Sequence, residues 1–209
     1  MPPTSTALSE RRALAALLEE KGPLAPTLCE GWTTSDLAAH LYVREHKPLA
    51  APGILVPQLA GLTERAMEAA KADIGYPGLL AAIRNGPPFP LSLVDSSVNT
   101  LEYFVHHEDV RRASKGWEPR VDADLDRALW SVLRRSAWLL TRRVKGVGLE
   151  LSAESFGSFG AKSGAVRVVM KGGPQELLLF LVGRKDVARV SFDGPQDAVS
   201  SLKDSRFGL

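Results

Sequence analysis

Apolar residues recur every three or four positions through most of the first 143 residues, and this spacing predicts helices. The apolar stripe is clearest over residues 122–143, and similar stripes lie in residues 7–21, 33–46 and 99–113. We therefore expect four principal helices, the number found in a simple helix bundle.

Capping and turn-forming residues mark the limits of the first two helices. The Gly-Pro pair at 22–23 stops the first helix, and we assign its N-terminal cap to Thr6 or Ser9. Thr33 followed by Asp36 forms an approximate capping box at the start of the second helix. The second helix should therefore begin directly after Thr33.

The pattern changes near residue 145, where alternating apolar residues begin to predict strands. We place a domain boundary there, with a helical bundle over residues 1–145 and a small α+β domain over residues 146–209. A Ser/Gly-rich turn is expected at residues 157–164. The other expected elements are strands at 146–155, 165–171 and 187–192 and helices at 175–182 and 196–203.

Composition and charge narrow the classes of partner. The 209 residues carry a formal net charge of +2, and the arginine pairs at 111–112 and 142–143 are ordinary for helix exteriors, so we expect no nucleic-acid partner. No apolar run approaches the roughly 20 residues of a membrane-spanning helix. Residues 1–4 lack a basic region followed by an apolar core, so we expect no signal peptide. We expect a cytoplasmic monomer or homodimer that binds no membrane.

A single cysteine, Cys29, limits the sulfur chemistry of the chain. One cysteine excludes an internal disulfide and a cysteine-based zinc site, and it is compatible with a reducing compartment. Cys29 precedes the second helix in a loop. It either approaches a functional site or, as we favour, is buried as a small hydrophobic residue.

The helix at 99–113 carries the strongest candidate for chemistry. Glu102 and His106 are four residues apart, so they lie on one side of the helix, next to its apolar stripe. Such a pair is half of a metal site, although a solvated ion pair is the more common outcome of this spacing. Position 111 is an arginine, which excludes a zincin helix, and we expect His107 and Glu108 to face solvent.

A further candidate lies on the helix at 33–46. His40 adjoins the apolar face of this helix, four residues after Asp36. Taken alone, a core histidine that is hydrogen bonded to a backbone carbonyl is the simpler interpretation. Considered with Glu102 and His106, His40 becomes a candidate third metal ligand from a second helix.

Three segments together resemble a known family. They are PTLCEGWT (26–33) followed by DLAAHL (36–41), then VNTLEYFVHHEDV (98–110), and finally GPQELLLFLVGR (173–184). They resemble the DinB-like superfamily and, within it, the mycothiol-dependent maleylpyruvate isomerase family of actinobacteria. The resemblance covers nearly the whole chain.

This resemblance implies a mainly α fold, with a DinB-like four-helix bundle followed by a small α+β C-terminal domain. It also implies a divalent metal, usually zinc, held by His40, Glu102 and His106. Three protein ligands leave one coordination position open, which is typical of catalytic zinc. In the family this position serves a low-molecular-weight thiol, mycothiol.

Other residues would support such a site. Asp36 and Asp109 are candidates to orient the metal ligands, although helix capping and surface pairing explain them equally well. Arg184 is a candidate contact for the thiol cofactor or an acidic ligand, and a role at the C-terminus of its helix explains it as well.

Three functions fit these features. We favour a metal- and mycothiol-dependent transferase or isomerase, in which a metal-bound thiolate attacks a small electrophilic substrate. The second is a metal-dependent hydrolase that activates water at the open position. The third is a non-catalytic metal-binding module, in which His107 or Asp109 completes the coordination of the metal.

Overall fold

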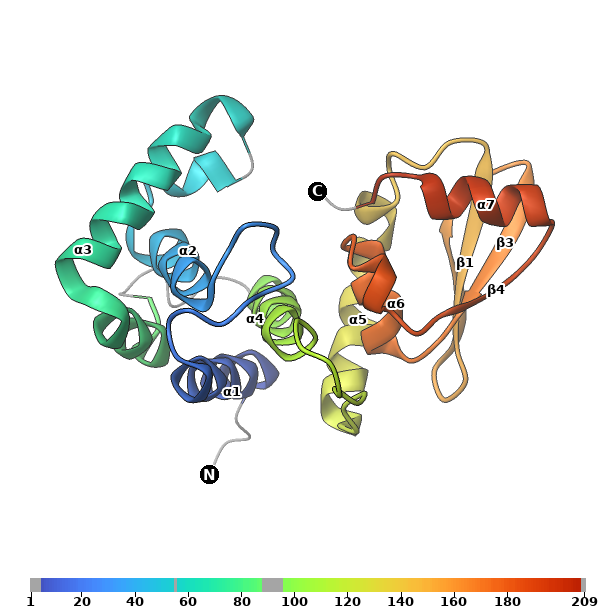
Figure 1. Ribbon diagram of the computed structural model, residues 1–209. Helices are drawn as coiled ribbons and strands as arrows, with labels where there is room; N and C mark the ends of the chain where they lie inside the picture. The colour runs from blue at the N-terminus through green and yellow to red at the C-terminus, as the bar shows by residue number, and fades with distance from the viewer. Residues whose placement is uncertain (1–4, 55, 88–95, 208–209) are drawn as a thin grey trace. The chain divides into compact units, whose positions relative to one another are not determined.

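The computed structural model describes residues 5–54, 56–87 and 96–207, and it divides into two compact units, Met1–Pro119 and Arg120–Leu209 (Figure 1). We expected the boundary near residue 145. The difference arises from helix α5 (Ala123–Leu140), which packs against helix α6 and strand β2 of the second unit. Its apolar stripe therefore belongs to the core of the C-terminal part. The segment 1–4, on which the expectation about a signal peptide rests, lies outside the described residues.

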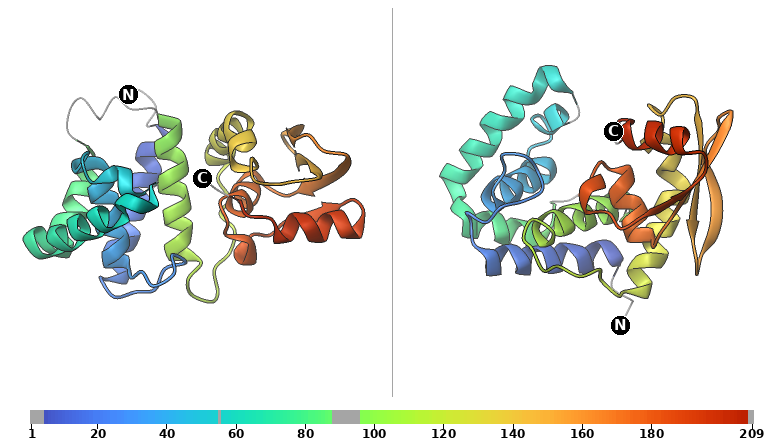
Figure 2. Two further views of the ribbon diagram at one scale, coloured as in Figure 1. Left: turned by 90° about the horizontal axis from the view of Figure 1, so that it is seen from above. Right: turned by 45° about the vertical axis from the view of Figure 1, so that its right-hand side comes forward.

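The first unit is built from helices. They are α1 (Thr6–Lys21), α2 (Thr34–His46), α3 (Ala60–Asn85) and α4 (Ser96–Arg111), with short 3-10 turns η1 (Ala51–Ile54) and η2 (Pro57–Leu59). Helix α1 packs against α4 and α3, and α2 packs against α3 (Figure 2). Fully buried leucines of α1 and α2 and the ring of Tyr103 on α4 form the core between them.

The helix limits follow from local chemistry. Thr33 and Asp36 form the expected capping box at the start of α2. The cap of α1 is Ser5, whose hydroxyl accepts a hydrogen bond from the N–H of Leu8, so the assignment to Thr6 or Ser9 was wrong. Helix α3 is broken at Gly75, where φ is +61°, a conformation that favours glycine.

The second unit surrounds a four-stranded sheet. Its elements after α5 are β1 (Val147–Ala153), β2 (Gly157–Lys162), β3 (Val166–Lys171), α6 (Pro174–Leu181), η4 (Lys185–Val187), β4 (Ser191–Asp193) and α7 (Gln196–Asp204). The strand order is β2-β1-β3-β4, with β1 and β3 parallel and the outer strands antiparallel to their neighbours. The expected mainly α fold with a small α+β C-terminal part is confirmed.

Two expectations about the sheet were wrong. Residues 157–162 form strand β2 instead of a turn. Their small side chains show no strand pattern, and the strand is formed because its backbone pairs with β1. The last strand covers only 191–193, since a 3-10 turn occupies 185–187. No helix in the described part of the chain is long and apolar enough to cross a membrane.

Candidate metal centre

Two helices of the first unit bring the three predicted ligands together. His40 projects from α2, while Glu102 and His106 lie one turn apart on α4. The Nε2 atoms of His40 and His106 each lie 3.3 Å from Oε1 of Glu102. One donor atom from each residue lies within 4.8 Å of the other two. The geometry therefore fits a shared cation, and metal binding by these residues stays a prediction.

Asp109 holds one of these imidazoles in place. Its Oδ2 lies 2.9 Å from Nδ1 of His106, and its side chain is fully buried. Because Nδ1 is engaged by the carboxylate, Nε2 is the nitrogen that faces Glu102. A carboxylate that binds the far nitrogen of a ligating histidine is the usual support of a metal site. That Asp109 orients a metal ligand stays a prediction, and this contact would allow it.

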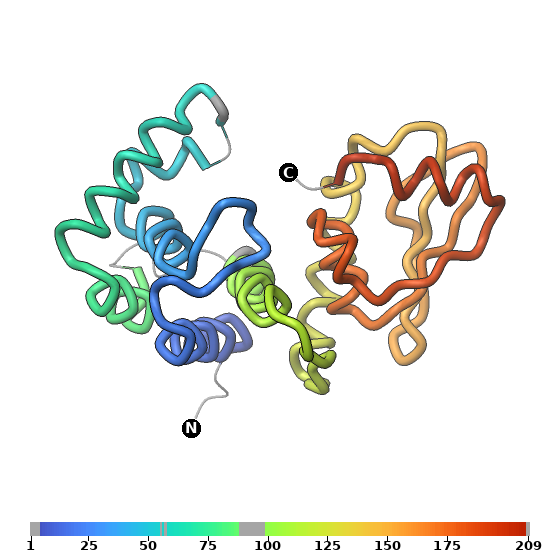
Figure 3. Tube along the Cα trace, in the orientation of Figure 1, coloured from blue at the N-terminus to red at the C-terminus, as the bar shows by residue number. Residues whose placement is uncertain are grey.

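The loop between α1 and α2 covers this part of α4 (Figure 3). The N–H of Leu28 donates to the carbonyl oxygen of Asp109 at 3.0 Å, and the ring of Trp32 lies 5.1 Å from that of His40. The Sγ atom of Cys29 lies 3.3 Å from Oδ2 of Asp109, and the residue is half-buried. Cys29 thus approaches the site, the alternative that we did not favour.

An arginine partly offsets the charge of the carboxylate. The Nε atom of Arg44 lies 3.5 Å from Oε1 of Glu102, and both of its terminal nitrogens contact the side-chain oxygen of Asn99. Burial raises the pKa of Glu102, but hydrogen bonds from His106 and His40 outweigh it and hold that pKa well below its usual range. Glu102 is therefore ionised and available to a cation.

The two imidazoles differ in their electrostatics. Burial lowers the pKa of His40, and this effect outweighs the hydrogen bond with Glu102. Burial also lowers the pKa of His106, but hydrogen bonds with Asp109, Cys29 and Glu102 raise it well above its ordinary value. In the absence of a metal, His106 is thus the protonated member of the pair.

Asp36 is engaged by residues other than the three predicted ligands. Its carboxylate accepts hydrogen bonds from the N–H and hydroxyl of Thr33, and it pairs with Nζ of Lys71 at 2.7 Å. These contacts place it at the N-terminus of α2, next to α3. Of the alternatives left open for Asp36, helix capping and pairing with a neighbour are the ones that its contacts support.

The expectation that His107 and Glu108 face solvent was wrong. Both are buried. The Nδ1 atom of His107 lies 3.2 Å from the carboxylate of Glu10, and Glu108 pairs with Arg112 at 2.6 Å. Because His107 is engaged by Glu10 on α1, it is not placed to complete the coordination of a metal. Helix periodicity predicted that these two side chains would be exposed. Both are buried because neighbouring segments cover α4 on more than one side.

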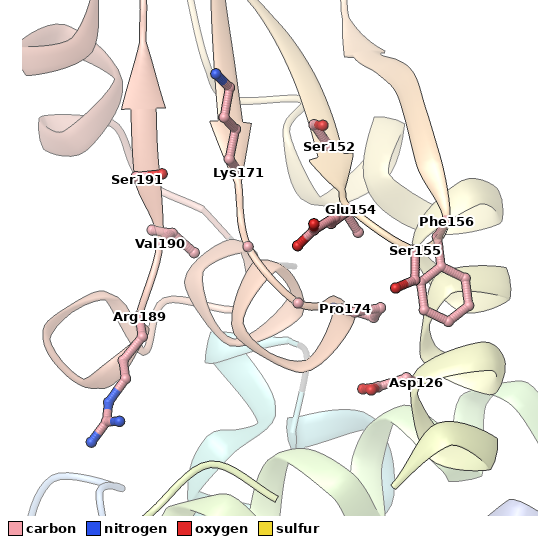
Figure 4. Close-up of a pocket in the computed structure, with 13 residues that line it drawn as sticks. Asp126, Ser152, Glu154, Ser155, Phe156, Lys171, Pro174, Arg189, Val190 and Ser191 are labelled. Atoms are coloured by element: carbon pink, nitrogen blue, oxygen red, sulfur yellow. The ribbon is translucent and has the colours of Figure 1, made fainter. Parts of the chain in front are cut away.

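The second unit holds Arg184 and a separate hollow. Arg184 follows α6, where it donates to the carbonyl oxygen of Val182 at 3.0 Å, so its predicted role toward a cofactor remains untested. A cavity of about 810 Å³ lies where β1 and β3 end and α6 begins (Figure 4). Lys171 and Arg189 point away from one another there, and carboxylates also line the cavity. Its charge therefore selects no class of ligand.

The donor set of the first unit fits a divalent metal. Two imidazoles and one carboxylate are the protein ligands of several catalytic zinc sites, and three such ligands leave a position for a substrate or water. The contact between Asp109 and His106 supplies the outer support that such sites use.

Comparison with known proteins shows what the fold resembles. No protein-family model and no curated protein sequence matches the chain. A crystal structure of a mycothiol-dependent maleylpyruvate isomerase has a similar fold, with a TM-score of 0.52 and 18% identity over 91% of this chain and 92% of that chain. A structure of the same enzyme with one histidine replaced by alanine matches equally well. The chain therefore has the fold of that enzyme.

Proposed function

We propose that the protein is a divalent-metal-dependent enzyme that uses a small thiol, with mycothiol as its co-substrate and a small electrophile as its substrate. The observation that carries the proposal is the convergence of His40, Glu102 and His106. The similarity in fold to a mycothiol-dependent isomerase supports the choice of thiol. We expect a transferase or isomerase reaction and zinc as the metal.

The charges of the site favour an anionic ligand beside the metal. Glu102 and Asp109 contribute two negative charges, and Arg44 contributes one positive charge. A divalent cation would leave this group of charges with a surplus of one positive charge. A thiolate would neutralise that surplus. A neutral ligand such as water would leave it in place.

The residues of the chain divide the work of such a site. His40, Glu102 and His106 would hold the metal, which when bound lowers the pKa of a coordinated thiol so that the thiolate is present at neutral pH. Asp109 keeps the His106 ring oriented through Nδ1. The ring of Trp32 packs against that of His40 on one side of the site. Arg44 holds the Glu102 carboxylate in position.

Elemental analysis of the purified protein tests the metal. We expect about one divalent ion per chain, lost in His40→Ala because one of three ligands is removed. His46→Ala is the matched control, since His46 lies on the same helix and stacks on Tyr42 instead. An equal loss of metal in both variants, or metal retained in both, would contradict the assignment.

Calorimetric titration of the metal-loaded protein with mycothiol tests the thiol. We expect binding that disappears when the metal is removed by a chelator. If the metal is present but mycothiol gives no heat, thiol chemistry is excluded while the metal site stands. Turnover of an ester or amide without any thiol would then favour the hydrolase.

A further inference from the structure

One face of α5 carries exposed basic side chains near an exposed tryptophan. Arg134 and Trp138 are four residues apart, so they are neighbours on one side of the helix, about 6 Å apart along its axis, and Arg142 follows in the turn directly after α5. Both arginines are exposed, and the Trp138 side chain is 66% exposed. A tryptophan normally buries most of its large apolar surface, so this exposure requires an explanation.

Two more cations lie near the C-terminal end of α5. Lys145 follows α5 and is exposed. Lys162 reaches from the end of β2 to the C-terminal end of α5, where its Nζ lies 3.4 Å from the carbonyl oxygen of Arg142. We call Arg134, Trp138, Arg142, Lys145 and Lys162 the α5 basic face.

The charge of the α5 basic face is not offset by nearby acidic groups in the sequence. The segment from Arg127 to Leu149 contains no aspartate or glutamate. Within the described residues, no ion pair engages Arg134, Arg142 or Lys145, whereas Arg127 at the other end of the helix pairs with Asp124. Uncompensated cations gathered on one face attract a partner with many negative charges.

The expectation that the protein binds no membrane rested on the lack of a spanning segment, which binding at a membrane surface does not need. We propose that the α5 basic face binds the surface of a membrane that contains anionic phospholipids. Clusters of lysine and arginine on an amphipathic helix bind acidic headgroups, and tryptophan settles at the level of the headgroups. Both features occur here on one face. The proposal does not depend on the metal site in the other unit.

The composition of the face favours lipid over other polyanions. The centre of a protein interface is depleted in charged residues, whereas here the exposed Trp138 is flanked along the chain by Arg134 and Arg142. Proteins that hold single-stranded nucleic acid use a basic groove with several aromatic rings, whereas this face is the convex side of a helix with one ring.

The contact would be peripheral. The apolar stripe of α5, which includes Leu125, Leu129 and Leu133, is buried in the core of the second unit, so the helix itself does not insert. Among the five residues of the α5 basic face, Trp138 is the apolar one that could enter the headgroup region. Binding should therefore be reversible and weakened by salt, because exposed charges are strongly screened at high ionic strength.

Vesicle flotation with the full chain tests the proposal. We expect the protein to float with phosphatidylcholine vesicles that contain phosphatidylglycerol, and to remain unbound with phosphatidylcholine alone or in 1 M salt. Arg134→Gln and Arg142→Gln should each weaken binding about fivefold, which corresponds to about 1 kcal/mol per cation. Arg65→Gln on α3 is the matched control, because Arg65 is an exposed helical arginine of the other unit.

Fluorescence reports on the tryptophan directly. On addition of the anionic vesicles, we expect a blue shift of tryptophan emission that is absent in Trp138→Phe, with the other three tryptophans retained. The proposal is overturned if the protein does not bind anionic vesicles at low salt, or if Arg65→Gln weakens binding as much as Arg134→Gln. Tighter binding to a single-stranded oligonucleotide than to the vesicles would also overturn it.

Discussion

The two units of this protein treat charge in opposite ways. The first unit buries many ionisable side chains: Glu10, Arg11, His40, Glu45, His106, His107, Glu108, Asp109 and Arg112. Among the described residues of the second unit, Glu176 is the buried charged residue. Helix α6 of the second unit contributes five consecutive apolar side chains, from Leu177 to Leu181, to the core of that unit. The core of the first unit therefore contains many charged side chains, whereas the core of the second unit is mainly apolar.

Several of the buried charged side chains in the first unit are hydrogen bonded to a partner of opposite charge. Arg11 makes two hydrogen bonds to Glu45, at 2.5 and 2.8 Å, and Glu45 also accepts one from the hydroxyl of Tyr103. Burial and the Glu45 charge raise the pKa of Tyr103, so it stays a neutral donor. Buried pairs cost more in desolvation than apolar packing does, so they are poor evidence for stability. Their concentration around α4 points to a functional demand.

The largest test of this comparison is to break a buried pair. In Arg112→Met the Glu108 carboxylate loses a partner at 2.6 Å in a site where both side chains are inaccessible to water. Because Arg111 still pairs with Glu108 at 2.6 Å, we expect a loss of about 1.5–3 kcal/mol in the free energy of unfolding, measured by urea denaturation. The change also removes the contact between Arg112 and the Trp117 ring.

A matched change in the second unit gives the contrast. Arg167 pairs with Glu150 across the sheet, but the Arg167 side chain is 68% exposed. Arg167→Met should therefore cost less than about 1 kcal/mol. Equal losses in the two arginine variants would show that the units do not differ in how they use charge.

A smaller effect is expected from changing the charge behind the metal ligands. Asp109→Asn keeps an oxygen near Nδ1 of His106 but removes the negative charge that orients the ring. We expect metal affinity to fall about 10- to 100-fold, measured with a competing chelator. Asp193→Asn, which alters an exposed pair with Lys171 on the sheet, should leave metal affinity unchanged.

The smallest effect concerns the pH dependence of the cap of α2. Burial raises the pKa of Asp36, but hydrogen bonds from Lys71 and Thr33 outweigh it and lower that pKa below its ordinary value. A lowered pKa stabilises the folded state above the unfolded pKa of about 3.9, and this stabilisation is lost as the pH falls through the folded pKa. Asp36→Asn should cost about 1 kcal/mol at pH 7.

The pH series is the readout for that variant. The difference in unfolding free energy between Asp36→Asn and the unchanged protein should shrink as the pH falls below about 4. A difference that stays constant down to acid pH would mean that the carboxylate charge of Asp36 does not contribute to stability.

Local spacing determined much of the candidate site. The pair Glu102/His106 is fixed by the helix period, and the capping box at Thr33 fixes the start of the helix that carries His40. That the two helices bring these three residues to one site was predicted from the resemblance to a family. Cys29 could not be placed, because it lies in a loop and meets Asp109, 80 residues later in the sequence, only through folding.

The sequence by itself determined the class of fold, the positions of most helices and the residue types able to hold a metal. These depend on periodicity and capping, which act over a few residues. The tertiary structure decided which charges are buried, as with His107 and Glu108, and that α5 packs with the sheet. It also decided that Lys162 joins the basic face of α5. Such outcomes depend on contacts between segments far apart in the chain, which no local pattern encodes.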